Sequence, residues 1–348
     1  MAVFEHPEFD GHEQVVFCHD EQTGLKAIIA IHNTFRGPAL GGCRMWPYAD
    51  GDEALTDALR LARGMTYKSA LAGLDLGGGK SVIIGDSRTQ KTGAMMRAMG
   101  RFVESLHGRY IIAEDVGTKP ADMNEISKET SHVMGTAGTG GDPSPATAYG
   151  VYAGLKASVA ERFGSDDLTD IRVALQGLGA VGYDLAKRLV DDGAVLCVSD
   201  INKQALAKAE RELGAKIVSP DSIHAVEADV FAPCALGAVL NDDTIPQIKA
   251  KVIAGSANNQ LAELRHGEML ADRGILYAPD YLINAGGVIY ISHVGPNFDV
   301  DRAFAHVGQI AKTLTEIYAR ARKDRTTPDV AADRMAEEKF SPAESVAA

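Results

Sequence analysis

Apolar and polar residues alternate along the first 120 positions with strand-like and helix-like periods in turn. Val15–Phe17, Lys26–His32 and Ser81–Ile84 are typical of strands, and Tyr110–Val116 is typical of a buried strand that ends in acids. Two helices are predicted by apolar residues three or four positions apart. The first begins near Asp50 and carries Leu55, Ala58, Leu59, Ala62 and Met65, and the second carries Met95, Met99, Phe102, Val103 and Leu106.

The pattern changes near residue 140. Gly138–Pro145 is rich in turn-forming residues and is a candidate hinge, and a helix is predicted from about Ala146 to Phe163. From Ile171 strands and helices alternate regularly, which favours a parallel, doubly wound sheet. The predicted strands are 172–176, 194–199, 216–218, 229–233, 251–254 and 275–278. The last predicted helix, about 301–322, precedes a polar tail whose end, Ser341–Ala348, is expected to be disordered.

A length of 348 residues suggests two domains. We expect a two-domain α/β protein with a cleft. Its substrate-binding and oligomerisation domain is predicted at 1–143, joined by 301–348, and its Rossmann-type domain at 144–300. The formal net charge of −12 argues against nucleic acid as a partner and favours small metabolites.

Composition also bears on where the chain works. The four cysteines show neither a CxxC pair nor metal-ligand spacing, which fits a reducing compartment and predicts no metal. The acidic start from Met1 to Asp10 is unlike a signal peptide, and no apolar run approaches the length of a membrane span. A cytoplasmic protein with no membrane partner is expected.

A glycine motif marks the strongest candidate binding site. Gly177-Leu178-Gly179-Ala180-Val181-Gly182 follows the strand 172–176 and opens a helix, so Gly177 allows a tight turn, Gly179 lets a pyrophosphate approach, and Gly182 lets helix and strand pack closely. Asp200 ends the next strand, 23 positions after Gly177, where an acid accepts a bond from the ribose 2′-hydroxyl. This acid favours NAD over NADP, a preference softened by the nearby Lys203. The alternative is a structural glycine turn with Asp200 as an ordinary loop acid.

The candidate chemistry in the first half consists of Lys68, Lys80 and Asp115. A phosphate-binding P-loop ending at Lys80 is rejected, because its first glycine would fall on Leu74 and the strand and helix stand in reversed order. Lys68 is suited to hold a carboxylate, and burial beside a second lysine favours the neutral amine that Lys80 needs as a general base. Asp115 is suited to exchange a proton with an amine. The alternatives are solvated lysines and a helix-capping acid.

These residues lie in stretches that resemble the family of glutamate, leucine, phenylalanine and valine dehydrogenases, and most of all its leucine dehydrogenase branch. The resemblance runs in the family's order over about residues 25–295. It is carried by seven stretches: Gly37–Trp46, Arg63–Lys68, Gly77–Ser81, Ala113–Gly117, Pro143–Gly150, Ala254–Gln260 and Asn284–Ile289.

The resemblance implies a role for each position. Lys68, Lys80 and Asp115 would be catalytic, with Lys68 also on the substrate carboxylate. The substrate would further contact Leu40, Gly41, Gly77, Gly78, Ala113, Asn259, Val288 and Ile291. NAD would be held by Thr147, Asn258, Gly177, Leu178, Gly179, Ala180, Val181, Gly182 and Asp200.

The implied reaction is NAD-dependent oxidative deamination of an L-amino acid to a 2-oxo acid and ammonia, in a homo-oligomer. Hydride leaves the substrate α-carbon, and water activated by Lys80 attacks the resulting imine. Closure about the hinge at Gly138–Pro145 would bring substrate and nicotinamide together.

The side-chain pocket implied by the resemblance is apolar: Leu40, Ala113, Val288 and Ile291. An apolar pocket argues against glutamate and favours a branched aliphatic substrate, with leucine foremost. The methyl group of Ala113 narrows the pocket relative to the glycine of aromatic-specific relatives. Tyr290 and the segment His293–Asp299 depart from the family pattern and bear on specificity.

Three alternatives stay open at this point. The first is an aromatic amino-acid dehydrogenase, such as phenylalanine dehydrogenase, which the pocket residues argue against. The second is a nicotinamide-dependent 2-hydroxy-acid dehydrogenase, whose chemistry calls for histidine and arginine rather than two lysines and an aspartate. The third is a regulatory NAD-binding protein without activity, which the retention of Lys68, Lys80 and Asp115 disfavours.

Overall fold

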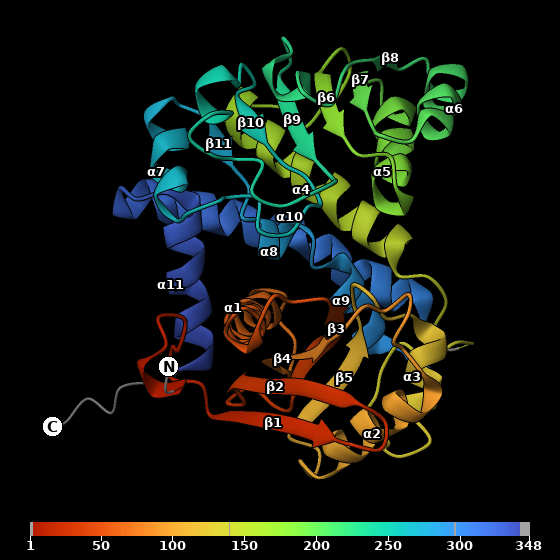
Figure 1. Cartoon of the computed structure of the whole chain (residues 1–348). Coiled ribbons are helices and arrows are strands. Elements are labelled where there is room, and N and C mark those ends of the chain that lie inside the picture. Colours follow the sequence, from red (N-terminus) through yellow and green to blue (C-terminus); the bar gives the residue numbers. More distant parts are fainter. Residues whose placement is uncertain (1–2, 139, 296, 342–348) are drawn as a thin grey trace, which may run out of the picture. The chain divides into compact units, whose positions relative to one another are not determined.

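The computed structural model describes residues 3–138, 140–295 and 297–341 (Figure 1). The chain divides into two compact units. Within the described residues, unit 1 takes 3–138, 140–141, 294–295, 297–298 and 336–341, and unit 2 takes Asp142–His293 and Asp299–Met335. Each unit contains one β-sheet with helices packed on it, and each is described by itself.

The sheet of unit 1 has five strands in the order β1-β2-β4-β3-β5. Strands β1, β2 and β4 pair antiparallel, whereas β3 pairs in parallel with both β4 and β5. The strand bounds are β1 Gln14–Asp20, β2 Leu25–Asn33, β3 Ala39–Trp46, β4 Gly77–Ile84 and β5 Tyr110–Glu114. Strand β3 was not among the predicted strands, because Gly41 and Gly42 interrupt its apolar run.

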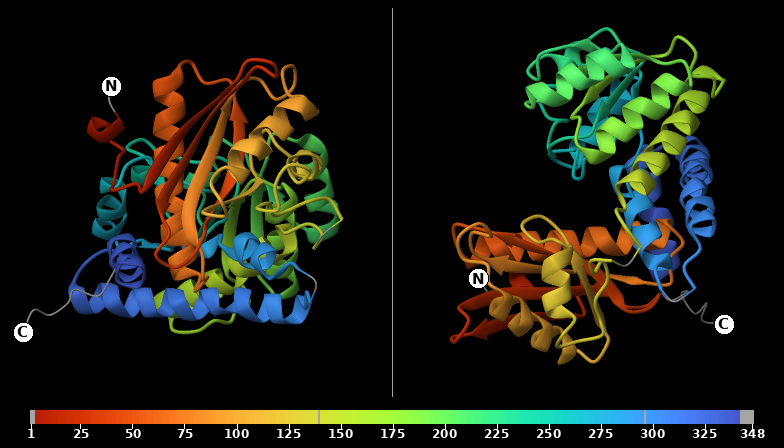
Figure 2. Two further views of the ribbon diagram at one scale, coloured as in Figure 1. Left: turned by 90° about the horizontal axis from the view of Figure 1, so that it is seen from below. Right: turned by 90° about the vertical axis from the view of Figure 1, so that its right-hand side faces the viewer.

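Helices cover both faces of this sheet, as the views in Figures 1 and 2 show. Helix α1 (Gly51–Leu71) packs on one face, where Ile28, Ala30 and Val82 meet its apolar side. Helices α2 (Gly93–Glu104) and α3 (Pro120–Ile126) pack on the other, against alternate positions such as Ile29 and Ile83. The two faces therefore follow from the two-residue period of the strands.

Unit 2 confirms the predicted parallel, doubly wound sheet. Its six strands run in the order β11-β10-β9-β6-β7-β8, all in parallel. Chain order reverses between β6 and β9, and ligands of such sheets bind at this point, beyond the carboxyl ends of the strands. The bounds are β6 Arg172–Gln176, β7 Val195–Ser199, β8 Lys216–Ile217, β9 Val230–Pro233, β10 Val252–Ile253 and β11 Leu276–Tyr277.

The helices of unit 2 include the long pair α4 and α10, which pack against each other. The side chains of Val307 and Ile310 on α10 approach Gly150 on α4, and the hydroxyls of Ser158 and Tyr318 lie 2.7 Å apart. The bounds are α4 Ser144–Phe163, α5 Ala180–Asp191, α6 Lys203–Leu213, α7 Arg265–Asp272, α8 Asp280–Ile283, α9 Gly286–His293, α10 Val300–Asp324 and α11 Pro328–Phe340. Short 3₁₀ helices occur at Val3–Glu5, Ile223–Ala225 and Ile245–Gln247.

The C-terminal region differs from the expectation that 301–348 joins the first domain. Residues 299–335 belong to unit 2 because the apolar side of α10 packs on α4, and only 336–341 of the described tail belong to unit 1. There the ring of Phe340 lies 5.1 Å from that of Tyr67. The expected polar tail is largely the helix α11, and 342–348, where disorder was expected, lie outside the described residues. Thr139, within the candidate hinge, also lies outside them.

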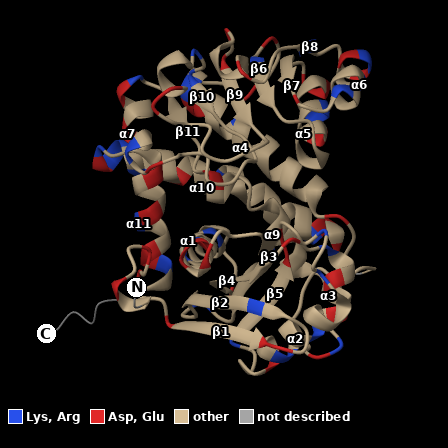
Figure 3. Ribbon diagram, in the orientation of Figure 1, with Lys and Arg blue, Asp and Glu red and all other residues tan. Residues whose placement is uncertain are grey.

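Charged residues of both signs lie mainly on helices and loops in the view of Figure 3, while the strands are mostly uncharged. Among the described residues, none of the helices has the length and apolar character needed to cross a bilayer. The described cysteines are all free thiols.

Candidate functional site

The candidate residues of unit 1 gather on the α1 face of its sheet. Because side chains alternate along a strand, the positions that share a face with Val82 include Gly78 and Lys80 on β4. The same alternation brings Leu40, Gly42 and Arg44 on β3, and Ile111 and Ala113 on β5, to this face. Asp115 follows directly after β5, so Lys80 and Asp115, 35 positions apart, come together.

Lys80 and Asp115 form an ion pair at the centre of this face. The ammonium of Lys80 donates to Oδ2 of Asp115, and only 7% of the Lys80 side chain is exposed. Burial by itself raises the pKa of Asp115, but the cations of Lys80 and Arg44 outweigh it and lower that pKa to about 2. Asp115 is therefore a carboxylate throughout the neutral range.

Arg44 extends this ion pair and was not singled out in the sequence. Its Nε lies 3.2 Å from Oδ2 of Asp115, and its Nη1 lies 2.9 Å from a carboxylate oxygen of Asp57 on α1. The hydroxyl of Tyr48 donates to the same Asp57 at 2.5 Å. The two-residue period of the strand could have indicated it, because Arg44 lies two positions from Gly42 and four from Leu40, on the same side of β3.

Two glycines keep space open on this face. A Cβ at Gly42 would lie 2.8 Å from Cβ of Asp115 and 3.3 Å from Nζ of Lys80. A Cβ at Gly78 would lie 2.0 Å from the backbone nitrogen of Thr66 on α1. Gly78 was predicted to approach the substrate, whereas Gly42 was missed although it shares the face of Lys80.

The other predicted residues of unit 1 occupy varied positions. Lys68, half-buried, lies in the last turn of α1, whereas Leu40 and Ala113 are buried in the sheet. Gly77 begins β4, and its carbonyl accepts from the hydroxyl of Ser69 on α1. Gly41 belongs to the opposite face, where the hydroxyl of Tyr110 donates to its carbonyl at 2.9 Å.

The glycine motif of unit 2 forms the predicted strand–turn–helix. Gly177 has φ +97°, a backbone region that favours glycine, and Gly179 caps α5. A Cβ at Gly182 would lie 2.0 Å from the carbonyl oxygen of Gly177, so only glycine lets the helix pack this closely. Nothing lies within 4 Å of a Cβ at Gly179, and that residue is exposed, as is Ala180. A shallow pocket of about 430 Å³ adjoins Leu178, Gly179 and Ala180.

Asp200 follows β7 and closes this loop. Its Oδ2 accepts from the backbone N–H of Leu178 at 2.6 Å, and its Oδ1 accepts from that of Asn202 at 2.7 Å. The carboxylate therefore stands beside the glycine turn, half-buried, where the fingerprint predicts it. Val181 occupies the first turn of the helix, also half-buried.

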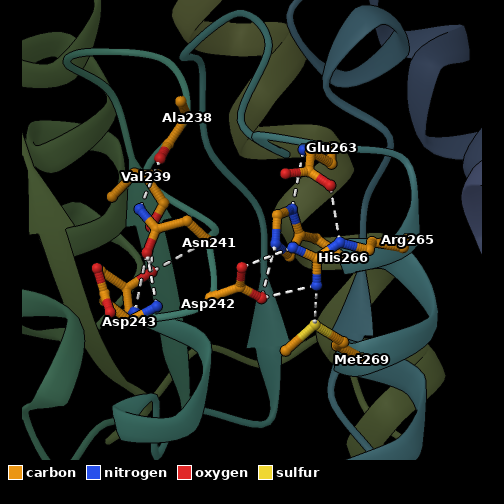
Figure 4. A network of polar contacts seen from close by, with 10 residues as sticks. Ala238, Val239, Asn241, Asp242, Asp243, Glu263, Arg265, His266 and Met269 are labelled. Carbon is orange, nitrogen blue, oxygen red and sulfur yellow. Dashed lines mark hydrogen bonds and ion pairs between the residues drawn. The ribbon is translucent and has the colours of Figure 1, made fainter.

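Asn258 and Asn259 lie exposed on the loop after β10. Asn259 has φ +51°, unusual for a residue with a side chain, and its carbonyl accepts from the N–H of Ala238 at 2.7 Å. A polar network further along ties the loop after β9 to the start of α7 (Figure 4). In it, Arg265 pairs with Asp242 at 2.6 Å, and Nδ1 of His266 accepts from the N–H of Glu263 at 2.8 Å. The loop after β9 therefore contacts both the asparagine segment, through Ala238, and the helix that follows it.

Asn284 is a third residue, after Arg44 and Gly42, that sequence reasoning did not single out. Its Nδ2 donates to Oδ1 of Asn258 at 2.8 Å, and it is 7% exposed. Its own Oδ1 is buried and has no hydrogen-bond partner among the described residues. A buried acceptor beside Asn258 fits a ligand that carries N–H groups, such as an amide.

Thr147, Val288 and Ile291 belong to the start of α4 and to α9. A Cβ at Gly287 would lie 2.7 Å from Oγ1 of Thr147, so the two helix starts pack closely. Val288 and Ile291 are half-buried and three positions apart, on one side of α9. Tyr290 is buried instead, with its ring 6.1 Å from that of Phe304 on α10.

The residues of unit 2 fit a dinucleotide. The open glycine turn, the exposed start of α5 and the acid after β7 together offer N–H groups for a pyrophosphate and an acceptor for a ribose. Within the described part of the chain, no cluster of three histidine, cysteine or acidic side chains is placed to hold a metal ion.

Comparison with known proteins gives the family. The family model described as "Glu/Leu/Phe/Val dehydrogenase, dimerisation domain" matches residues 12–132. The model described as "Glutamate/Leucine/Phenylalanine/Valine dehydrogenase" matches residues 198–327.

Individual relatives match over nearly the whole chain. Leucine dehydrogenase of Geobacillus stearothermophilus is 57% identical over 98% of this chain and 94% of its own length. Leucine dehydrogenase of Thermoactinomyces intermedius is 55% identical over the same shares. The crystal structure of L-tryptophan dehydrogenase from Nostoc punctiforme superposes with a TM-score of 0.85 and 46% identity, over 95% of this chain and 96% of that one. The chain therefore belongs to the glutamate, leucine, phenylalanine and valine dehydrogenase family, as its motifs predicted.

Proposed function

We propose that this protein catalyses the NAD-dependent oxidative deamination of a branched-chain or small aliphatic L-amino acid, leucine foremost, to the 2-oxo acid and ammonia. As a member of its family the chain is an amino-acid dehydrogenase, and this family uses a nicotinamide cofactor. The observation that carries the assignment is the buried pair of Lys80 and Asp115. A lysine and a carboxylate in contact offer the base and the proton exchange that amine oxidation needs.

In the proposed reaction, the three charged candidates of unit 1, Lys68, Lys80 and Asp115, have separate tasks. Lys68 binds the substrate carboxylate, helped by Asn259 and by the backbone of Gly77 and Gly78. Lys80, in its neutral amine form, takes a proton from the water that attacks the imine carbon and becomes an ammonium. Asp115 stays ionised at neutral pH, so it accepts a proton from the substrate amine and returns it when ammonia leaves.

A bound nicotinamide would supply the acceptor for the hydride of the substrate α-carbon. Thr147 and Asn258 are proposed to hold its carboxamide, and the hydrogen bond from Asn284 orients Asn258. The run from Gly177 to Gly182 is proposed to hold the pyrophosphate. Asp200 is proposed to bind the adenosine ribose, and its negative charge disfavours the additional phosphate of NADP.

Substrate preference is proposed to follow from Leu40, Ala113, Val288 and Ile291. Their side chains carry no charge, so they offer no partner to a second substrate carboxylate. An aromatic substrate is the second candidate, supported by the 46% identity to a protein named tryptophan dehydrogenase. The aliphatic assignment is favoured because the relatives named leucine dehydrogenase are 55–57% identical and because Ala113 carries a methyl group.

A homo-oligomer is proposed because residues 12–132 match a model described as a dimerisation domain. A cytoplasmic location is proposed because the thiols of all four cysteines are free, as in a reducing compartment.

The proposed function predicts the outcome of an assay with a panel of L-amino acids at alkaline pH, followed by the absorbance of reduced nicotinamide. We expect fast turnover of leucine, valine and isoleucine with NAD, slow turnover of phenylalanine and none of glutamate. A preference for an aromatic substrate would agree with the proposed amino-acid oxidation but contradict the proposed aliphatic side-chain pocket. Absence of turnover on every amino acid would contradict the proposed function.

Replacement of Asp200 tests the cofactor assignment. Asp200→Asn removes the charge but keeps an oxygen that accepts from the N–H of Leu178, whereas Asp200→Ala removes both. We expect both variants to raise the KM for NAD by about 10-fold, the effect of one lost hydrogen bond to a charged group, and to narrow the preference for NAD over NADP. Only Asp200→Ala should also lower the melting temperature. Unchanged cofactor kinetics in both variants would show that Asp200 does not contact the ribose.

A further inference from the structure

Arg44 lies between two carboxylates on the α1 face of the sheet. Its Nε contacts Oδ2 of Asp115 at 3.2 Å, and its Nη1 contacts both oxygens of Asp57 at 2.9 and 3.2 Å. The side chains of Arg44, Asp57 and Asp115 are each about one quarter exposed, at 24%, 26% and 23%. These groups and Tyr48 form one continuous chain of polar contacts from α1 to Lys80.

We propose that Arg44 is a positioning residue for the reaction, which holds the carboxylate of Asp115 ionised and turned toward Lys80. This inference rests on the proposed function, in which Asp115 exchanges protons with the substrate amine. Arg44 itself is assigned no contact with the substrate.

The geometry of the carboxylate supports this role. One oxygen of Asp115, Oδ2, accepts hydrogen bonds from both Nε of Arg44 and Nζ of Lys80. The guanidinium therefore fixes the orientation of the carboxylate that binds Lys80. The backbone of Asp115 is fixed as well, because its N–H donates to Oγ1 of Thr118 at 3.0 Å. With the carboxylate and the backbone of Asp115 both held in place, a proton is exchanged at a defined oxygen atom.

Asp57 makes the guanidinium rigid. It accepts from Arg44 with both oxygens, and the hydroxyl of Tyr48 donates to Asp57 at 2.5 Å. A planar guanidinium reaches two carboxylates in fixed directions, which the point charge of a lysine ammonium does not reproduce. Lysine at position 44 would therefore keep the charge but lose part of the orientation.

The charges around Asp115 set the direction of the pH effect. The groups on its own face are Lys80 from β4, Arg44 from β3 and, beyond Arg44, Asp57 from α1 with Tyr48. Cys43 and Tyr110, buried on the opposite face, also interact with Asp115 electrostatically. Burial raises the pKa of Asp115, and Lys80 and Arg44 lower it. Loss of Arg44 removes one of the two cations that lower the pKa of Asp115, so the carboxyl of Asp115 keeps a proton up to a higher pH.

The experiment compares Arg44→Met and Arg44→Lys with Arg101→Met in the full-length enzyme. Arg101 also pairs with an aspartate of unit 1, Asp20 at 3.2 Å, but on an exposed part of the surface. We expect Arg44→Met to lower kcat by about 10-fold or more and to move the rising limb of kcat/KM upward by about one pH unit. In Arg44→Lys the rising limb of the pH profile of kcat/KM should return to its wild-type position, whereas kcat should recover only in part. Arg101→Met should match the wild type, and the KM for NAD should stay constant throughout.

A purely structural role for Arg44 predicts a different pattern. Loss of the link to α1 would then lower the melting temperature of Arg44→Met and of Arg44→Lys while the pH limb stays in place. An unmoved limb in Arg44→Met, at any melting temperature, overturns the proposal.

A second readout separates this proposal from the proposed function. Acetylation of Lys80 by acetic anhydride at one fixed pH, measured by mass spectrometry on the peptide that contains Lys80 and compared with the peptides of exposed lysines, requires no turnover. We expect Lys80 to react more slowly in Arg44→Met than in the wild type and in Arg101→Met, because Oδ2 of Asp115 then accepts a hydrogen bond from Lys80 alone. Equal reactivity of Lys80 in all three proteins would overturn the coupling between Arg44 and the pair. If the wild type deaminates no amino acid, the proposed function fails, while this readout still decides whether Arg44 acts on the pair of Lys80 and Asp115.

Discussion

Lys80→Ala is expected to lower kcat/KM for amino-acid oxidation by about 10²–10⁴-fold, the usual contribution of a positioned general base. The side chain of Lys80 is 7% exposed, and its ammonium is in contact with the carboxylate of Asp115. Its removal leaves Asp115 paired with Arg44, so the sheet keeps a satisfied carboxylate while the attacking water loses its base. Stopped-flow and steady-state absorbance of reduced nicotinamide measure the loss.

Two further measurements make the Lys80→Ala result specific to base catalysis. NAD affinity by calorimetry should remain at the wild-type value, because the glycine motif belongs to unit 2. Added methylamine should restore part of the rate, because a small amine fits the space that the lysine side chain leaves. Lys26→Ala, at an exposed position of the neighbouring strand β2, serves as the control and should behave as the wild type. Turnover at the wild-type rate in Lys80→Ala would remove Lys80 from the mechanism.

Gly78→Ala is expected to have the second largest effect, on stability and activity together. The added Cβ would lie 2.0 Å from the backbone nitrogen of Thr66 and 2.3 Å from its Oγ1, so α1 has to move away from β4. Overpacking of this kind costs about 1–3 kcal/mol, which lowers the melting temperature by several degrees. Lys68 lies two positions after Thr66 on α1, and a displacement of about 1 Å at such a group costs on the order of 10²-fold in rate.

Gly64→Ala provides a matched control on the same helix. No atom lies within 4 Å of a Cβ at Gly64, so alanine there should stabilise the helix by about 0.5–1 kcal/mol and leave kcat unchanged. Differential scanning calorimetry and steady-state kinetics on both variants test the pair. Equal melting temperatures and rates for Gly78→Ala and the wild type would mean that α1 tolerates a larger separation from β4 than the structure indicates.

The local pattern of the sequence was a good guide to the second half of the chain. Each strand of the unit 2 sheet was predicted to within one residue at either end. The central strands, such as β6 and β9, are buried and apolar, which makes them easy to recognise, and the exposed strand β8 was found from its place in the alternation of strands and helices. The glycine motif was placed correctly for a related reason, since its physical requirements lie within a few consecutive residues. Its conformation, including φ +97° at Gly177, follows from contacts along one short segment.

The first half was harder to predict because its sheet contains both parallel and antiparallel strand pairs. Strand β3 lies between β4 and β5 although β4 comes later in the chain, and the glycines at 41 and 42 weaken its strand signal. The residue pattern and the family resemblance pointed to Lys80 and Asp115 without their geometry. The contacts of Gly42 and Arg44 with Asp115 follow only from the position of β3 beside β5.

By itself the sequence determined the two α/β halves, the dinucleotide motif, the identity of the charged residues and the family. Tertiary structure alone decided that Arg44 meets Asp115, 71 positions away, that Gly78 meets Thr66, and that α10 packs on α4 rather than joining unit 1. The physical reason is that hydrophobic periodicity and turn chemistry act over a few neighbouring residues. Strand order and helix docking depend instead on which apolar faces bury each other across the whole unit.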